Sequence, residues 1–109
     1  MKILRDKKCL ITGAASGIGR ATAIATAKEK AALFLTDINP KGLEETAEAC
    51  RKIGATVIHH ALDISDYKAV KAWAEEIHNK HGSLDVLMNI AGISIWGSVE
   101  NLTHEDWRR

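Results

Sequence analysis

Three glycines in an eight-residue run have the spacing of a turn that binds phosphate. The run TGAASGIG, residues 12–19, lies between a short apolar stretch and an alanine-rich one. A chain that turns quickly from strand into helix needs one glycine that can adopt positive φ. A second glycine without Cβ lets backbone N–H groups approach a phosphate, and a third lets helix and strand pack closely. The N-terminus of the next helix offers unpaired donors and a favourable dipole to an anion. The residues of this predicted diphosphate site are Gly13, Ser16, Gly17, Ile18 and Gly19.

Two other glycine motifs are excluded by the residues at their defining positions. A P-loop needs Gly-Lys-Ser/Thr five residues after Gly13, where Ile18-Gly19-Arg20 stands. A hydrolase nucleophile elbow needs glycine two residues before Ser16, where Ala14 stands. A glycine turn that only packs a helix stays open as an alternative, because the glycine pattern by itself is a weak signal.

An acidic residue follows at the distance at which a dinucleotide site needs one. Asp37 stands 18 residues after Gly19, at the end of the apolar run ALFLTD, where a carboxylate can accept hydrogen bonds from the adenosine ribose. It would repel the 2′-phosphate of NADP, and neither Ser16 nor Ile38 supplies a compensating cation, so NAD is favoured. The alternative for Asp37 is an acid at the N-terminus of a helix before Pro40.

Strands and helices alternate along the rest of the chain. Apolar runs predict strands over residues 8–12, 32–37, 55–62 and 84–92. The stretches between them predict helices from the glycine turn to Lys30, over 41–53 and over 66–80. Strands that are apolar throughout and alternate with helices indicate a parallel sheet covered on both faces, a doubly wound α/β fold.

Helical periodicity predicts which side chains face this sheet. The expected buried positions are Leu43, Ala47 and Cys50 in one helix and Val70, Trp73, Ala74 and Ile77 in the next. Pro40 is expected in a loop, where it interrupts no ladder of hydrogen bonds.

Composition bounds the class of protein. The chain has 109 residues, enough for one small domain. Fifteen basic and fourteen acidic residues give a net charge of +1, which argues against a nucleic acid or anionic membrane partner. The charged start and the lack of a long apolar run argue against a signal peptide or membrane span, and with only Cys9 and Cys50 they favour a reducing cytosol without a disulfide.

With these motifs in order, the sequence resembles the short-chain dehydrogenase/reductase family along its whole length. The family pattern Thr-Gly-x-x-x-Gly-x-Gly is matched by Thr12, Gly13, Gly17 and Gly19. The resemblance implies a Rossmann-type doubly wound sheet, four strands in the order 3-2-1-4, that binds NAD or NADP. It makes Asp37 the ribose acid and implies adenine contacts from Asp63 and Ile64. The family's Asn-Asn-Ala-Gly is matched by Asn89, Ala91 and Gly92 but not by Ile90.

The resemblance also places chemistry beyond this chain. It implies a catalytic asparagine on the helix after NLTHEDW, then a serine and a Tyr-x-x-x-Lys pair further on. Thr103 and Asp106 resemble a capping box, so a helix is expected to begin just before Arg109. We therefore expect residues 1–109 to be about half of the family domain, without a catalytic residue of their own.

One tyrosine and one lysine do have the catalytic spacing. Tyr67 and Lys71 lie at the start of the helix after the third strand, about 14 Å across the sheet from the fourth strand at ~4.8 Å per strand spacing. A proton donor must approach its substrate oxygen to within about 3 Å. We interpret the pair as an amphipathic flank and a solvated charge.

The histidines of the predicted third strand and third helix, and two of the tryptophans, are expected to have structural roles and not catalytic or metal-binding ones. His59 and His60 are neighbours on a strand and must point to opposite faces, while His78 and His81 have no third metal ligand on their segment. Trp73 and Trp107 are expected to pack, and Trp96 is a candidate for the mouth of the active site in a complete enzyme.

The sequence therefore supports the dinucleotide-binding part of an NAD-dependent oxidoreductase acting on an alcohol or ketone. Three classes remain open: this part of an enzyme, a free-standing module that binds nucleotide or a partner without catalysis, and an unstable truncated product. The resemblance implies a homo-oligomer for the complete protein. Its substrate cannot be inferred from these residues.

Overall fold

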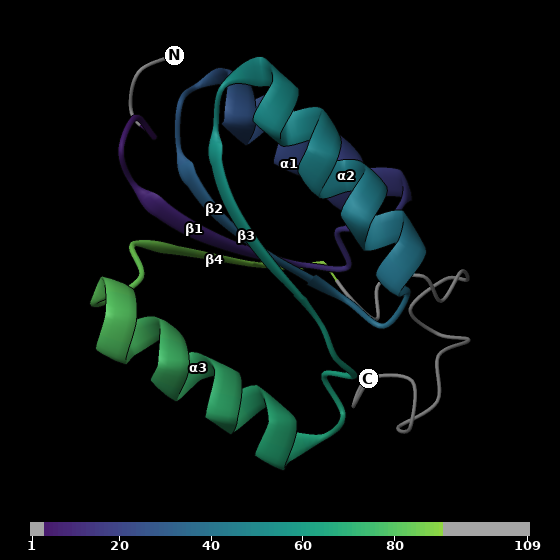
Figure 1. The fold of residues 1–109 in the computed structure, drawn as a ribbon, viewed down its shortest axis with the longest axis vertical. Coiled ribbons are helices and arrows are strands. Elements are labelled where there is room, and N and C mark those ends of the chain that lie inside the picture. Colours follow the sequence, from purple (N-terminus) through teal and green to yellow (C-terminus); the bar gives the residue numbers. More distant parts are fainter. Residues whose placement is uncertain (1–3, 91–109) are drawn as a thin grey trace, which may run out of the picture.

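The computed structural model describes residues 4–90, which form a parallel four-stranded sheet with helices on both faces (Figure 1). The elements in chain order are β1 (Lys8–Thr12), α1 (Gly17–Lys28), β2 (Ala32–Asp37), α2 (Pro40–Ile53), β3 (Thr56–Ala61), α3 (Tyr67–His81) and β4 (Val86–Asn89). The strand order is β3-β2-β1-β4, and each neighbouring pair is parallel. The predicted fold class and strand order are confirmed.

Each face of the sheet has its own apolar core. Helices α1 and α2 cover one face and α3 covers the other (Figure 1). Burial explains why the helices dock: the predicted face of α2, Leu43, Ala47 and Cys50, is fully buried in the larger core together with Ile11, Leu33 and Leu35. The smaller core contains Leu10, Phe34, Trp73 and Ile77.

The periodicity of α3 predicted too wide a buried face. Trp73 and Ile77 are buried as expected, but Val70 is half-buried and Ala74 is exposed. The prediction for Ala74 is wrong, because among residues 4–90 no second helix packs beside α3 to cover this position.

The starts of α2 and α3 are fixed by side chains that accept hydrogen bonds from the first turn. In α2, Asn39 is the N-cap: its side-chain oxygen accepts from the Gly42 N–H, 3.1 Å, and Pro40 is the first helical residue. Pro40 therefore does not lie in a loop as predicted, because the first turn of a helix tolerates a residue that lacks an N–H. Asp66 caps α3 in the same way through the Ala69 N–H, 3.2 Å.

Helix α1 ends two residues earlier than the sequence predicted. It ends at Lys28, and Lys30 adopts the left-handed conformation, φ +67°, while its N–H donates to the Ala27 carbonyl, 3.0 Å. This is the usual geometry of a helix C-terminus, but glycine commonly occupies that position. The wrong end point arises because no glycine marks it.

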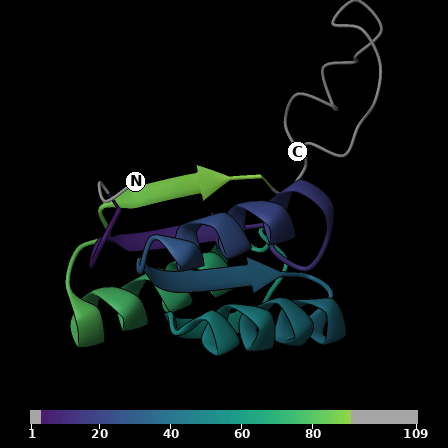
Figure 2. The ribbon, with the colours of Figure 1, turned by 90° about the horizontal axis from the view of Figure 1, so that it is seen from above.

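Strand β4 forms one edge of the sheet, beside β1 (Figure 2). The strand is shorter than predicted: it starts at Val86, so Leu84 and Asp85 precede it, and the last two predicted strand residues lie outside the described part. Val86 and Met88 pack against the larger core, whereas Leu87 on the other face is 65% exposed. Between residues 4 and 90 no helix is long and apolar enough to cross a membrane.

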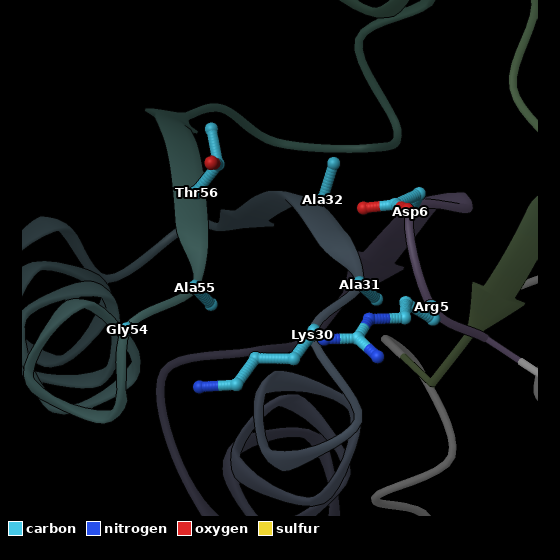
Figure 3. Close-up of a pocket in the computed structure, with 8 residues that line it drawn as sticks. All are labelled: Arg5, Asp6, Lys30, Ala31, Ala32, Gly54, Ala55 and Thr56. Carbon is cyan, nitrogen blue, oxygen red and sulfur yellow. The ribbon is translucent and has the colours of Figure 1, made fainter. Parts of the chain in front are cut away.

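A shallow cavity of about 290 Å³ lies at the amino ends of the strands (Figure 3). Its charged lining residues are Arg5, Asp6 and Lys30, and the Lys30 ammonium donates to the Ile53 carbonyl at the end of α2, 3.1 Å. Ligands of open α/β sheets bind at the opposite, carboxyl edge. The cavity is therefore separate from the residues that the sequence singled out.

Candidate dinucleotide site

The glycine turn begins directly where β1 ends, and its glycines have separate structural roles. Gly13 and Gly17 adopt positive φ, +69° and +56°. A Cβ on Gly19 would overlap the carbonyl group of Gly13, so only glycine lets the first turn of α1 approach the end of β1. Around Gly17, in contrast, a Cβ would meet no atom within 4 Å. The turn is closely packed at Gly19 and open at Gly17.

The first turn of α1 is suited to an anion. The N-cap residue, Ser16, makes no side-chain capping hydrogen bond, and the first turn contains no acidic residue. The first N–H groups of a helix have no partner within it and carry the positive end of the helix dipole. The Gly17 backbone is exposed beside them. These features fit a diphosphate held by backbone N–H groups.

The turn is also attached to the end of β2. The Ala14 N–H donates to the Thr36 carbonyl, 3.1 Å, and the Ala15 N–H donates to Asp37 Oδ2, 2.9 Å. The other carboxylate oxygen, Asp37 Oδ1, accepts from the Asn39 N–H, 3.0 Å. The structure therefore brings the predicted ribose acid next to the predicted phosphate turn.

The Asp37 carboxylate fits a ribose. A carboxylate offers about four acceptor positions, and the two backbone N–H groups use one on each oxygen. Asn39 is the N-cap of α2, and its N–H donates to Asp37 Oδ1, so Asp37 also lies beside the start of this helix. Asp37 is half-exposed, so its remaining acceptor positions can meet solvent or a ligand.

Sequence reasoning missed Arg20 in this region. From the first turns of α1, its Nη2 donates to the Ala15 carbonyl, 2.6 Å, and the Gly42 carbonyl, 3.2 Å, and its Nε donates to Thr46 Oγ1, 2.9 Å. It thereby connects the glycine turn to α2. No local signal could have identified it, because its partners on α2 become neighbours only when the two helices pack together.

Asp63 and Ile64 follow β3 at the same carboxyl edge. The Leu62 N–H donates to the Asp37 carbonyl, 3.0 Å, which ties the end of β3 to the end of β2. Asp63 Oδ1 accepts from the N–H and the hydroxyl of Ser65, 2.9 and 2.7 Å, and so shapes the turn before α3. Ile64 is half-buried beside it. Both residues lie at the edge where the resemblance expects adenine contacts.

Asn89 lies at the end of β4 and is joined to β1. The Thr12 hydroxyl donates to Asn89 Oδ1, 2.9 Å, and accepts from the Ile90 N–H, 2.9 Å. These bonds join the carboxyl ends of the neighbouring strands β1 and β4, beside the point at which α1 leaves β1. Ala91, Gly92, Trp96, Trp107 and the expected helix start at Thr103 lie outside the described residues.

The Tyr67 and Lys71 pair is positioned away from this site. Tyr67 is the first residue of α3, is 73% exposed, and follows β3, while β4 forms the opposite edge of the sheet. Lys71 is also exposed. The structure agrees with the interpretation of the pair as a solvated flank.

His59 and His60, neighbours on β3, point to opposite faces of the sheet as predicted. The His59 ring contacts Arg51 Nη2 of α2, 3.4 Å, while the His60 ring stacks on Trp73 of α3, 5.8 Å between centroids. Burial, followed by the nearby Arg51 charge, lowers the pKa of His59. Among the described residues no three His, Cys, Asp or Glu side chains are grouped as metal ligands.

Both cysteines are buried thiols without a disulfide. Burial raises the pKa of Cys9 and of Cys50, so both remain protonated at neutral pH. Both cysteines are buried, as expected from their apolar sequence positions.

Comparison with known proteins places this geometry in a family. The sequence model of the short chain dehydrogenases matches residues 7–109, nearly the whole chain. The chain belongs to the short-chain dehydrogenase family. In this member of the family, the glycine turn, the acid after the second strand and the asparagine of the fourth strand lie at one edge of a Rossmann-type sheet.

Two curated relatives illustrate the extent of the match. The chain is 46% identical over 90 residues to an uncharacterized oxidoreductase of Bacillus subtilis, covering 83% of this chain and 33% of that protein. It is 36% identical over 104 residues to a 3-oxoacyl-[acyl-carrier-protein] reductase of Thermotoga maritima, covering 95% of this chain and 42% of the relative. The chain thus spans less than half the length of these two curated relatives.

Solved structures of similar fold include cofactor complexes. Carveol dehydrogenase from Mycobacterium avium in complex with NAD matches 99% of this chain and 44% of its own, with a TM-score of 0.80 and 25% identity. L-Sorbose reductase from Gluconobacter frateurii, complexed with NADPH and L-sorbose, matches 99% of this chain and 42% of its own, with a TM-score of 0.80 and 32% identity.

Proposed function

We propose that this chain is the dinucleotide-binding part of a nicotinamide-dependent oxidoreductase, and that it binds NAD in preference to NADP. One observation carries the proposal: the Asp37 carboxylate accepts the Ala15 N–H, so a ribose acid and a phosphate turn form one site. The structurally similar NAD and NADPH complexes support a nicotinamide cofactor. They favour neither of the two forms, so the preference rests on Asp37.

Each part of the site has a separate binding task in this proposal. Backbone N–H groups of the glycine turn and of the first turn of α1 hold the diphosphate, and Asp37 accepts from the adenosine ribose hydroxyls. Asp63 and Ile64 border the adenine, while Asn89, Ala91 and Gly92 border the half of the cofactor beyond the switch point. The nicotinamide, when bound, supplies the hydride acceptor or donor for an alcohol or ketone.

The charge of Asp37 sets the proposed preference. A 2′-phosphate would bring negative charge against the carboxylate, and the exposed neighbour Ile38 offers no cation to offset it. Ile38 is 68% exposed and apolar, which suits contact with a flat base more than with a phosphate.

Residues 1–109 are not expected to catalyse hydride transfer by themselves. Tyr67 is the only tyrosine in the sequence, and it lies on the far side of the sheet from β4. We infer that the complete protein takes its proton-transfer groups from residues that follow this part. In this proposal the complete protein is a cytoplasmic oxidoreductase, and the chain is its cofactor-binding portion.

Calorimetric titration of the purified chain with NAD and with NADP tests the proposal. We expect NAD to bind at least about tenfold more tightly than NADP. Asp37→Asn should lose most of this preference, while Asp6→Asn, which changes an exposed acid at the amino edge of the sheet, should keep it. Absence of heat with either dinucleotide on folded protein would reject the binding site, and equal affinities would reject the preference.

A further inference from the structure

We propose that Arg20 is a positioning residue that fixes Asp37 through Ala15 and thereby sets the selectivity between NAD and NADP. The inference rests on the proposed function, because it assigns Asp37 to the ribose. It adds a residue that contacts no part of the cofactor in this scheme and acts only through the backbone of the glycine turn.

The guanidinium of Arg20 joins three segments. Its Nη2 donates to the Ala15 carbonyl in the turn and to the Gly42 carbonyl in α2, and its Nε donates to Thr46 Oγ1 one turn further along α2. Thr46 is fully buried, and its hydroxyl donates to the Gly42 carbonyl, 3.1 Å. Hydrogen bonds from a charged donor with a planar, fixed fork hold both distance and angle.

Ala15 transmits this restraint to Asp37. Its carbonyl accepts from Arg20 on one side of its Cα, and its N–H donates to Asp37 Oδ2 on the other. Ala15 is 2% exposed, and a Cβ placed on Gly42 would lie only 3.0 Å from the Ala15 carbonyl oxygen and Cβ. Little space is left for Ala15 to shift without moving the acid that it holds.

The exposed ion pair of Arg20 does not account for its position. Glu45 Oε1 lies 3.3 Å from Nη2, but the two side chains are 37% and 58% exposed, and pairs of this kind contribute little. The buried carbonyl and hydroxyl acceptors are the specific partners. Arg51 offers a matched comparison, because it also combines an exposed pair, with Glu48, and a backbone bond, to the Val57 carbonyl, away from the turn.

The change in selectivity between NAD and NADP has opposite signs for a positioning role of Arg20 and for direct binding of a phosphate. If Arg20 orients Asp37, Arg20→Met should weaken NAD more than NADP, by about tenfold, because Asp37 loses its fixed geometry. If Arg20 itself binds a 2′-phosphate, the same change should weaken NADP more than NAD. The second result would overturn the proposal.

The test combines exchange of the Ala15 amide proton in the ligand-free chain with titrations of NAD and NADP. In Arg20→Met we expect Ala15 exchange to accelerate at least about tenfold and the selectivity for NAD to fall. Arg20→Lys should recover part of both, since an ammonium can still reach one carbonyl, and Arg51→Met should change neither. Unchanged Ala15 protection and unchanged selectivity in Arg20→Met would overturn the inference.

The two proposals can fail separately. If the unmodified chain binds neither dinucleotide, the proposed function fails, and Ala15 exchange by itself decides whether Arg20 positions the acid. If Arg20→Met does not fold, Thr46→Val removes the acceptor of Nε while keeping the charge. Faster Ala15 exchange in that variant supports the inference, and unchanged exchange contradicts it.

Discussion

At the scale of single residues, the site depends on glycines that lack a side chain as much as on the carboxylate of Asp37. Gly19 lacks the Cβ that would overlap the Gly13 carbonyl, and Gly17 has the positive φ that brings the chain into α1. Asp37 then holds the turn in place through Ala15. Spacing predicted these residues, because each conformational requirement can be met by few residue types.

Gly19→Ala should be the more damaging of two glycine changes in the turn. The added Cβ meets backbone atoms that cannot rotate away, and we expect a loss of about 3 kcal/mol in the free energy of unfolding. Gly17→Ala meets open space and costs about 1 kcal/mol from its positive φ. Urea denaturation followed by circular dichroism compares them, and equal losses would contradict the packing argument.

His59 should make the stability of the fold depend on pH. Its pKa is lowered in the folded state, so the unfolded chain binds the proton more readily. The contribution of His59 to the free energy of unfolding should therefore be fully present above about pH 6.5. It should decrease as the pH falls from there toward the pKa of the folded state. His59→Gln should flatten this part of a curve of unfolding free energy against pH. A slope that is unchanged in the variant would assign it to other groups.

Arg20 shows the limit of prediction at this scale. The residue is visible in the sequence next to Gly19, but its acceptors lie 22 to 26 positions away on Gly42 and Thr46. Such contacts follow from how α1 packs on α2, and a single sequence carries no periodic signal for them. Asp63 and Asn89 were singled out by the resemblance to the family, and the structure has both near the carboxyl ends of parallel strands.

At the scale of elements, apolar runs and periodicity predicted all seven helices and strands of the described part. The errors lie at their ends, where single side chains decide. Asn39 and Pro40 form the start of α2, which the sequence could have indicated, because a capping residue followed by proline is typical of a helix start. Lys30, in contrast, occupies a helix end that usually needs glycine.

Replacing Lys30 by glycine should stabilise the fold. Glycine adopts φ near +67° without the strain of a Cβ, a gain of about 1 kcal/mol, from which the loss of the exposed bond to the Ile53 carbonyl subtracts about half. Lys28→Gly, inside the last turn of α1, should instead destabilise by about 1 kcal/mol. Thermal unfolding of both variants checks this, and a lower midpoint for Lys30→Gly would contradict it.

At the scale of the whole molecule, the two faces of the sheet are covered unequally. In the part of the chain that the structure describes, α1 and α2 pack on one face and α3 on the other, and β4 forms one edge of the sheet (Figure 2). Leu87 of this strand is exposed. The strand VLMN, residues 86–89, contains no charge or proline that would oppose pairing with another strand. An uncharged edge strand of this kind offers unpaired backbone groups to another strand.

The isolated chain should therefore self-associate through β4. Leu87→Lys places a charge on the exposed edge and should increase the monomeric fraction in sedimentation velocity experiments. Ile38→Lys changes a similarly exposed apolar residue directly after the carboxyl end of β2. It should leave self-association unchanged. Dissociation by Ile38→Lys and not by Leu87→Lys would locate the contact at the cofactor edge instead.

The two bonds from Ala14 and Ala15 to the end of β2 have a thermodynamic consequence. Because these bonds already order the loop in the folded chain, the loop should lose little conformational entropy when a nucleotide binds. Little binding free energy is then needed to order it. Small pieces such as adenosine diphosphate should then retain a large share of the binding free energy of the intact coenzyme.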